Sequence, residues 1–218
     1  MKVDFLTKVI FRAFTLAEVL ITLGIIGIVA AMTLPALISK IEKAVLKSQI
    51  KKMYSTLTQV QQKVMFENGD FVTSSNFGYN EFNEAIIKSL KIIQVCEKNA
   101  LAKGCIPKYQ GLDISSGACP GFSENSIYNT STVYVLNDGT FLIPYHMDWR
   151  SLWLVDVNGK KGPNKAGYDL FEVRYDENFL GGSNKTPVLD FIGKGCLNQG
   201  NPPPVKGGLD NYKNIDRW

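Results

Sequence analysis

The hydrophobic pattern first marks a long apolar segment close to the N-terminus. Residues 12–38 read RAFTLAEVLITLGIIGIVAAMTLPALI, and the 20 residues from Val19 to Ile38 include no charged side chain. A helix rises about 1.5 Å per residue, so this run can cross the roughly 30 Å hydrocarbon layer of a bilayer. We therefore predict a membrane-spanning or filament-core helix over residues 14–38, called the apolar segment below.

Beyond Ile38 the helical period continues, but only one face stays apolar. Hydrophobic residues recur every three or four positions, the spacing of an amphipathic helix: Leu46, Ile50, Met53, Leu57, Val60 and Val64. The opposite face is expected to carry polar side chains, namely Lys47, Lys51, Lys52, Gln61 and Gln62. The pair Asn68-Gly69 suits the left-handed end of a helix. The pattern predicts one helix over Phe14–Glu67 whose second half, residues 39–68, packs on its own head domain, with a coiled-coil dimer as the alternative.

The remaining residues, 70–218, form the predicted head domain. A helix is expected over Glu81–Val95 and loops over Gly104–Ser131, where Gly, Ser, Asn and Pro are frequent. Four strands are expected, the first two joined by the Asn137-Asp138-Gly139 turn: Thr132–Leu136, Thr140–Tyr145, Ser151–Val157 and Leu170–Tyr175. The tail, residues 200–218, is predicted to be extended and surface-lying. The predicted fold class is α+β, a long N-terminal helix packed on an antiparallel sheet of about four strands.

Composition and net charge exclude few classes of protein. The 218 residues are 11% aromatic and 20% charged, as in ordinary folded proteins. The net charge of +4 falls to +2 when the first 13 residues, with three basic side chains and one acidic side chain, are removed. Bulk charge therefore gives no argument for a nucleic-acid partner. His146 is the lone histidine and no Ser or Cys stands in a nucleophile motif, so we expect no enzymatic activity.

A single acid stands at the start of the apolar segment. Glu18 follows Ala13 by five residues, with Phe14-Thr15-Leu16 between them, and the leader before it is basic, with Lys2, Lys8 and Arg12. A charge is costly in lipid, so an acid at this position is by default functional. An ordinary secretory signal and a plain single-pass anchor are alternatives, but neither explains this combination of small residue, aromatic residue and placed acid.

These features resemble the N-terminus of type IV prepilins and type II secretion pseudopilins, which carry a cut site, a placed acid and a placed proline, here Pro35. The resemblance implies that a prepilin peptidase cuts between Ala13 and Phe14 and methylates the new amine. It also implies that the helix assembles with homologous subunits on an inner-membrane platform. Ala13 stands where the family usually has Gly, but its side chain is still small.

The same resemblance gives the location and the partners. With the positive-inside bias of the leader, it places residues 1–13 in the cytoplasm and the helix once across the bacterial inner membrane. The head would then lie outside the cytoplasm, in a periplasmic or cell-surface filament after assembly. The expected partners are the peptidase, other pilin-like subunits, the assembly platform and, before assembly, membrane lipid.

Physical chemistry suggests a role for the acid. Cleavage would create an amine at Phe14 in or near lipid, and the Glu18 carboxylate lies at a similar depth. A paired charge costs far less there than an isolated one, so Glu18 of one subunit could meet the Phe14 amine of its neighbour. An otherwise strongly helix-forming sequence is interrupted at Gly24, Gly27 and Pro35. These residues are either ordinary tolerated residues of a membrane helix, or they allow this section of the helix to stretch in a filament, as the family's helices do.

The most informative stretch of the head runs from Asp156 to Asp169. Asp156, Asn158 and Asp169 are candidate ligands of a hard cation such as calcium, because their oxygens alternate around a glycine turn. Major pseudopilins carry a calcium loop late in the head, and this stretch is similar in place and oxygen content. Lys160 stands where a calcium loop of the EF-hand kind would have an acid. The alternative is a tight turn in which Asp156 caps the backbone.

Four cysteines lie in the head: Cys96, Cys105, Cys119 and Cys196. An even count in an exported domain predicts two disulfides with three possible connectivities. Among these we favour Cys96–Cys105 together with Cys119–Cys196. Zinc-site spacings are absent.

The sequence therefore predicts a structural subunit of a type IV pilus-like or type II secretion pseudopilus filament. The main alternative is a membrane-anchored extracytoplasmic binding domain that does not polymerise, and an anchored hydrolase is a further one. A leader retained on the mature protein would favour the anchored domain.

Overall fold

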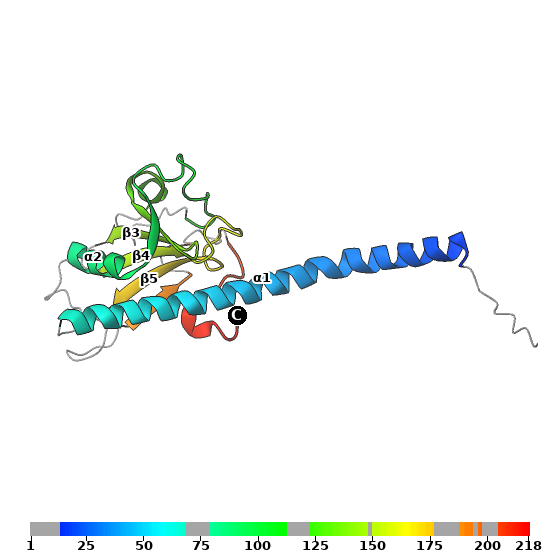
Figure 1. Ribbon diagram of the computed structural model, residues 1–218, viewed down its shortest axis with the longest axis horizontal. Coiled ribbons are helices and arrows are strands. Elements are labelled where there is room, and N and C mark those ends of the chain that lie inside the picture. Colours follow the sequence, from blue (N-terminus) through cyan, green and yellow to red (C-terminus); the bar gives the residue numbers. More distant parts are fainter. Residues whose placement is uncertain are drawn as a thin grey trace, which may run out of the picture. The chain divides into compact units, whose positions relative to one another are not determined.

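The computed structural model describes residues 14–68, 79–112, 123–147, 150–176, 188–193, 196–197 and 205–218. Helix α1 (Leu16–Asn68) is a continuous helix of 53 residues (Figure 1). Its last residue lies one position past the predicted end, and the Asn68 side-chain amide donates to the Val64 carbonyl oxygen at 2.6 Å. The chain divides into two compact units within this helix, Met1–Ala44 and Val45–Trp218.

In the first unit the helix exposes its apolar side chains. Exposed fractions of the large hydrophobic residues range from 44% at Val19 to 86% at Phe14. By length and composition, α1 can cross a membrane. Pro35 lies inside the helix without ending it, although a proline removes one backbone N–H and with it one helical hydrogen bond.

In the second unit the predicted stripe of α1 is buried as expected, and all six of its members belong to one hydrophobic core. Gln61 is the exception to the predicted polar face, because it is only 3% exposed. The reason is its position: it lies four residues after Leu57 and three before Val64, so it shares their face of the helix. The prediction that Gln61 lies opposite the stripe is wrong.

The head is an antiparallel sheet of six strands in chain order, so the fold class is α+β as predicted. Helix α2 (Tyr79–Ser89) precedes the first strand. The strands are β1 (Ile92–Cys96), β2 (Val133–Leu136), β3 (Phe141–Met147), β4 (Arg150–Asp156), β5 (Leu170–Asp176) and β6 (Val188–Ile192). The four predicted strands correspond to β2–β5, while β1 and β6 were not predicted.

Only the first part of the predicted helix over Glu81–Val95 is helical. Helix α2 ends at Ser89, and the following segment pairs with β2 instead, with Cys96 opposite Val133. The β-branched residues of β1 favour a strand once a neighbouring strand is present. Their spacing alone had suggested a continued helix.

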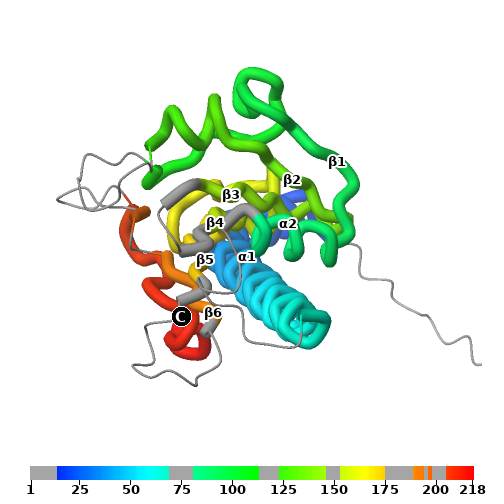
Figure 2. Tube along the Cα trace, turned by 90° about the vertical axis from the view of Figure 1, so that its left-hand side faces the viewer, coloured from blue at the N-terminus to red at the C-terminus, as the bar shows by residue number. Residues whose placement is uncertain are grey.

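Both faces of the sheet are covered. One core contains the α1 stripe and α2, and the other includes buried residues of the segments 96–112 and 127–128 (Figure 2). Strand β3 shows the alternation: Leu142 belongs to the first core, and Phe141 and Ile143 belong to the second. The π-helical turn η1 (Ser126–Thr130) contacts β3.

The C-terminal tail packs against α1 and does not lie loosely on the surface. Leu209 and Ile215 are buried in the same core as the stripe. The ring of Tyr212, in the short helix η3 (Tyr212–Asn214), stacks on Tyr54 with 3.9 Å between ring centroids and an interplanar angle of 3°. The prediction of a surface-lying tail is therefore wrong for residues 205–218, since its apolar residues face the helix.

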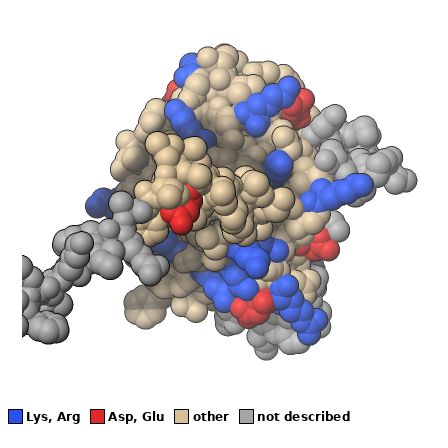
Figure 3. Space-filling view, turned by 90° about the vertical axis from the view of Figure 1, so that its right-hand side faces the viewer, with Lys and Arg blue, Asp and Glu red and all other residues tan. Residues whose placement is uncertain are grey.

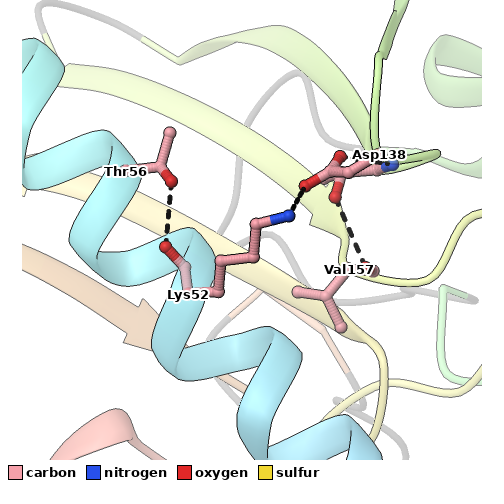
Figure 4. A network of polar contacts seen from close by, with 5 residues as sticks. Lys52, Thr56, Asp138 and Val157 are labelled. Carbon is pink, nitrogen blue, oxygen red and sulfur yellow. Dashed lines mark hydrogen bonds and ion pairs between the residues drawn. The ribbon is translucent and has the colours of Figure 1, made fainter.

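Polar contacts join α1 to the head as well. The Lys52 ammonium lies 2.7 Å from the Asp138 carboxylate, and Asp138 occupies the predicted turn between β2 and β3 (Figure 4). The same carboxylate accepts the Thr140 backbone N–H at 3.2 Å. At the tail, Lys51 lies 2.7 Å from the Asp216 carboxylate.

The predicted Cys96–Cys105 disulfide is present. The second predicted pair includes Cys119, which lies outside the described residues. Cys196 is fully buried, and no cysteine in the described part of the chain is free. The Cys196 backbone N–H donates to the Glu172 carboxylate at 2.7 Å, and Arg174 pairs with the same buried acid. These contacts satisfy the buried Glu172 carboxylate.

Candidate functional site

The first candidate site is the N-terminal end of α1. Phe14 is 86% exposed, and the helix begins two residues later. Ala13, the predicted residue before the cut, lies outside the described residues. Glu18 is in the first turn of the helix, where a carboxylate is favoured by the unpaired backbone N–H groups.

Thr15 holds Glu18 in place through a reciprocal contact. The Thr15 backbone N–H and hydroxyl both donate to Oε2 of Glu18, each at 2.8 Å, and the Glu18 backbone N–H donates back to the Thr15 hydroxyl oxygen at 3.2 Å. This is a capping box, in which a threonine and a glutamate three residues later satisfy one another's backbone groups. Sequence reasoning missed Thr15, although the spacing Thr-x-x-Glu was the signal for it.

The remaining polar side chains of the apolar segment are satisfied within their own helix. The Thr22 hydroxyl donates to the Val19 carbonyl at 3.0 Å, and the Thr33 hydroxyl donates to the Val29 carbonyl at 2.9 Å. Among the described residues, Oε1 of Glu18 accepts no such bond. One acceptor oxygen of the apolar segment, Oε1 of Glu18, is therefore not used within the described chain.

The small residues of the segment leave room for a neighbour. A Cβ added at Gly24 or Gly27 would meet no atom within 4 Å. Small residues let two membrane helices approach closely. Pro35 lies in the same exposed helix.

The second candidate site is the loop from Asp156 to Asp169. Both carboxylates are fully buried. Oδ1 of Asp156 accepts the backbone N–H groups of Asn158 and Gly159 at 3.2 and 2.8 Å, while Oδ2 accepts the Tyr109 hydroxyl at 2.9 Å. This pattern is the capped turn that the sequence left open as the alternative to calcium.

The other end of the loop is closed in the same way. The two carboxylate oxygens of Asp169 accept the backbone N–H groups of Asn164 and Lys165, each at 2.6 Å. Gly159 takes a φ of +66°, and a Cβ there would lie 2.2 Å from the Gly139 carbonyl oxygen. Only glycine fits so close to the β2–β3 turn.

Protein donors already use the carboxylate oxygens of this loop, which disfavours a calcium ion, since calcium takes about six to eight oxygen ligands. All four carboxylate oxygens of Asp156 and Asp169 are occupied by protein donors. Within this loop, the amide oxygens of Asn158 and Asn164 are buried without a hydrogen-bond partner. Within the described ranges, no three His, Cys, Asp or Glu side chains lie close enough together to hold a metal.

Burial dominates the electrostatics of the loop. It raises the pKa of Asp156 well above its ordinary value, and the nearby Asp169 carboxylate raises it further, against the hydrogen bonds from Tyr109, Asn158 and Gly159. Burial likewise raises the pKa of Asp169. The Tyr109 phenol, buried beside Asp156, also has its pKa raised well above normal.

On the one face drawn in Figure 3, the charged side chains of the described residues mark no enclosed site. On the face drawn in Figure 3, basic side chains occur in several separate groups with acidic side chains between them. His146 lies in β3 opposite Ser151, but its side chain is outside the described part of the structure.

No family model matches this chain, and neither a curated protein nor a solved structure matches it. Function is therefore inferred from the residues and their geometry.

Proposed function

We propose that this chain is a pilin-like subunit: a prepilin that is cut between Ala13 and Phe14 and assembles into a filament through its N-terminal helix. The observation that carries the proposal is the exposed apolar segment with its one acid. From Phe14 to Ile38 the large hydrophobic side chains of the segment are exposed. Glu18 stands in the first turn of the same helix.

The physical argument is that this surface needs cover. Exposed apolar patches larger than a few hundred Å² mark interaction or membrane surfaces. Lipid supplies the cover for a single subunit in the inner membrane, and the helices of sister subunits supply it in a filament. The head would lie on the extracytoplasmic side, as the basic leader favours.

The Glu18 carboxylate favours a subunit that assembles over a simple membrane anchor. A plain anchor has no use for a carboxylate in its apolar part, where the charge is costly. A helix that docks against copies of itself can pair the carboxylate with the amine that cleavage creates at Phe14. The filament would be either a type II secretion pseudopilus or a type IV pilus.

Intact mass spectrometry of the protein from native membranes tests the proposal. We expect a mature chain of 205 residues, from Phe14 to Trp218 of the 218 residues encoded, that begins with a methylated phenylalanine. Ala13→Gly is expected to be cut as well, while Ala13→Leu is expected to keep the leader because its side chain is no longer small.

A wild-type chain that keeps residues 1–13 would contradict the proposal and favour the anchored binding domain. Sheared filaments give the second measurement, since cut subunits should be recovered in the filament fraction and chains with the leader should not.

A further inference from the structure

We infer that the end of the head at which α1 joins it is a docking surface for the anionic lipid headgroups of the bilayer that the apolar segment crosses. Three segments form this surface, called the basic end below: residues 45–52 of α1, the loop 157–169 and the tail 205–218. The inference rests on the membrane-anchored part of the proposed function and does not require a filament.

Contacts between the three segments make the basic end one surface. The Lys51 ammonium of α1 lies 2.7 Å from the Asp216 carboxylate of the tail. The Tyr168 hydroxyl of the loop donates to the Lys206 carbonyl oxygen of the tail at 2.8 Å. The ring of Tyr168 also packs edge-on against Trp218, with 5.9 Å between ring centroids. The tail therefore lies against both the helix and the loop.

Positive charge is concentrated at the basic end. Its three segments contain nine basic and three acidic residues, and Asp169, one of the acidic three, is fully buried. The basic residues are Lys47, Lys51, Lys52, Lys160, Lys161, Lys165, Lys206, Lys213 and Arg217. Nine minus three gives a net charge of +6, which exceeds the +4 of the whole chain. The rest of the chain is therefore net negative, and the positive charge of this protein is local.

Acidic side chains of the protein offset only part of this charge. Lys51 pairs with Asp216, whose side chain is 80% exposed, and Lys52 pairs with Asp138. The loop 157–169 has no acid besides the buried Asp169, while its lysines at positions 160 and 161 are exposed. Exposed ammonium groups of this kind bind phosphate oxygens through charge-assisted hydrogen bonds.

The apolar segment brings an anionic surface within reach. Lys47 follows Ile38, the last residue of that segment, by nine positions on the same continuous helix. This separation is about 14 Å at 1.5 Å per residue. The headgroup layer extends about 5–8 Å beyond the hydrocarbon, and the field of anionic lipids reaches about 8 Å further at physiological salt. The first lysine of the basic end thus lies inside that field, where each lysine gains attraction to anionic lipid.

Aromatic residues of the basic end support a lipid partner over a free anion. Trp and Tyr side chains are enriched at the interface between membrane and water, because one end of each is apolar and the other polar. Trp218 and Tyr168 are both partly exposed and lie in contact at this surface. A surface that combines them with lysines fits a headgroup layer better than it fits a dissolved phosphate.

Amide hydrogen exchange of the full chain in lipid nanodiscs tests the inference. Discs of phosphatidylcholine alone are compared with discs in which about one third of the lipid is phosphatidylglycerol. We expect exchange in the loop 157–169 and the tail 205–218 to slow at least about fivefold in the anionic discs, which corresponds to a single docked lysine. The slowing should disappear in about 0.5 M salt, because salt screens the attraction.

Lys160→Gln combined with Lys161→Gln removes two charges from the exposed part of the loop. This variant should lose most of the lipid-dependent slowing in the tail, which carries no substitution, and should match wild type in phosphatidylcholine discs. Lys63→Gln combined with Lys103→Gln is the matched control, since it removes the same charge at two exposed positions outside the basic end. The control should keep the slowing in the tail.

Equal exchange in the two kinds of disc, or equal loss from the two pairs of substitutions, would overturn the inference. Inorganic phosphate or a short DNA duplex that slows exchange in phosphatidylcholine discs as strongly as phosphatidylglycerol does would also overturn it, because the surface would then recognise phosphate without a membrane. Chains that are cut and form filaments but show no docking would leave the proposed function standing. Chains that dock but keep their leader would overturn the proposed function alone.

Discussion

At the scale of single residues, Asp138 links the β2–β3 turn to α1. Its carboxylate accepts a hydrogen bond from the Lys52 ammonium at 2.7 Å (Figure 4). It also accepts one from the Thr140 backbone N–H at 3.2 Å. Burial alone would raise the pKa of Asp138, but the hydrogen bonds from Lys52 and Thr140 outweigh it and lower that pKa. A folded-state pKa below the unfolded value means that the charged carboxylate stabilises the fold.

Asp138→Asn should therefore cost stability at neutral pH, and the cost should shrink on acidification. The charged Asp138 carboxylate contributes its full stabilisation above the unfolded pKa of about 3.9. This stabilisation is lost as the pH falls through the lower folded pKa. The check is urea denaturation of the full chain in detergent at a series of pH values. Glu84→Gln, which removes the exposed Glu84–Lys88 pair, is the matched control and should show little change at any pH. A cost that grows at low pH would contradict the assignment.

Calcium provides a second prediction at this scale. Because protein donors occupy the carboxylates of Asp156 and Asp169, we expect about 1 mM calcium to leave the free energy of unfolding unchanged. A site with a dissociation constant of about 10 μM would add about 2.7 kcal/mol at that concentration. Thermal melting of the full chain with calcium or with EDTA measures the difference. A clear stabilisation that Asp156→Asn abolishes would restore the calcium site.

At the scale of elements, α1 has two kinds of surface on one continuous helix. Its second half buries a stripe of six hydrophobic residues against the sheet, α2 and the tail. Helical stability in proteins comes mainly from such packing of one face rather than from intrinsic propensity. The first half has no such cover in the described chain, as its exposed side chains show.

Ile50→Ala should therefore destabilise the head strongly. Ile50 is completely buried in the centre of the stripe, and truncating an isoleucine in a core costs about 2–5 kcal/mol. Ser48→Ala changes an exposed position on the same helix and should stay within about 0.5 kcal/mol of wild type. Urea denaturation compares the two variants. An equal cost for both would mean that the stripe does not pack as described.

The tail is the second element to test. A double-mutant cycle with Tyr54→Ala and Tyr212→Ala should give a coupling energy of about 0.5–1.5 kcal/mol, the usual contribution of a stacked aromatic pair. Replacing Tyr54 in a variant that also carries Arg217→Ala is the control, because Arg217 is exposed. Additive losses for the two tyrosines would show that the tail is not held against α1 in solution.

At the scale of the whole molecule, the chain combines an exposed apolar segment with a head that covers both faces of its sheet. Among the described residues, the two cores of the head include none before Leu46, while the large hydrophobic side chains of the apolar segment are exposed.

Glu18→Ala should leave membrane insertion and leader removal intact but reduce filament assembly, because in the proposed filament neighbouring subunits would lose the carboxylate that pairs with the Phe14 amine. Thr22→Ala is the control: its hydroxyl bonds only to its own helix, so this variant should assemble normally. Membrane fractionation, N-terminal mass and filament yield are measured together. Normal filament yield from Glu18→Ala would refute the role of the acid.

Local patterns were enough to predict α1, its buried stripe, the turn at Asp138 and four strands. Each depends on residues close together in the chain: a period of three or four for the stripe, and Asp138-Gly139 for the turn. The Thr15–Glu18 box is equally local, because its Thr-x-x-Glu spacing is present in the sequence.

The sequence by itself determined the long helix α1, its apolar segment and its buried stripe, because helix period and apolar length are properties of neighbouring residues. The tertiary structure alone decided that residues 92–96 form a strand, since a strand needs partners that lie about 40 residues away along the chain. It also decided that the tail packs on α1. The same holds for Asp156: Tyr109, distant in sequence, reaches its carboxylate, so only the folded chain shows that this acid caps a turn.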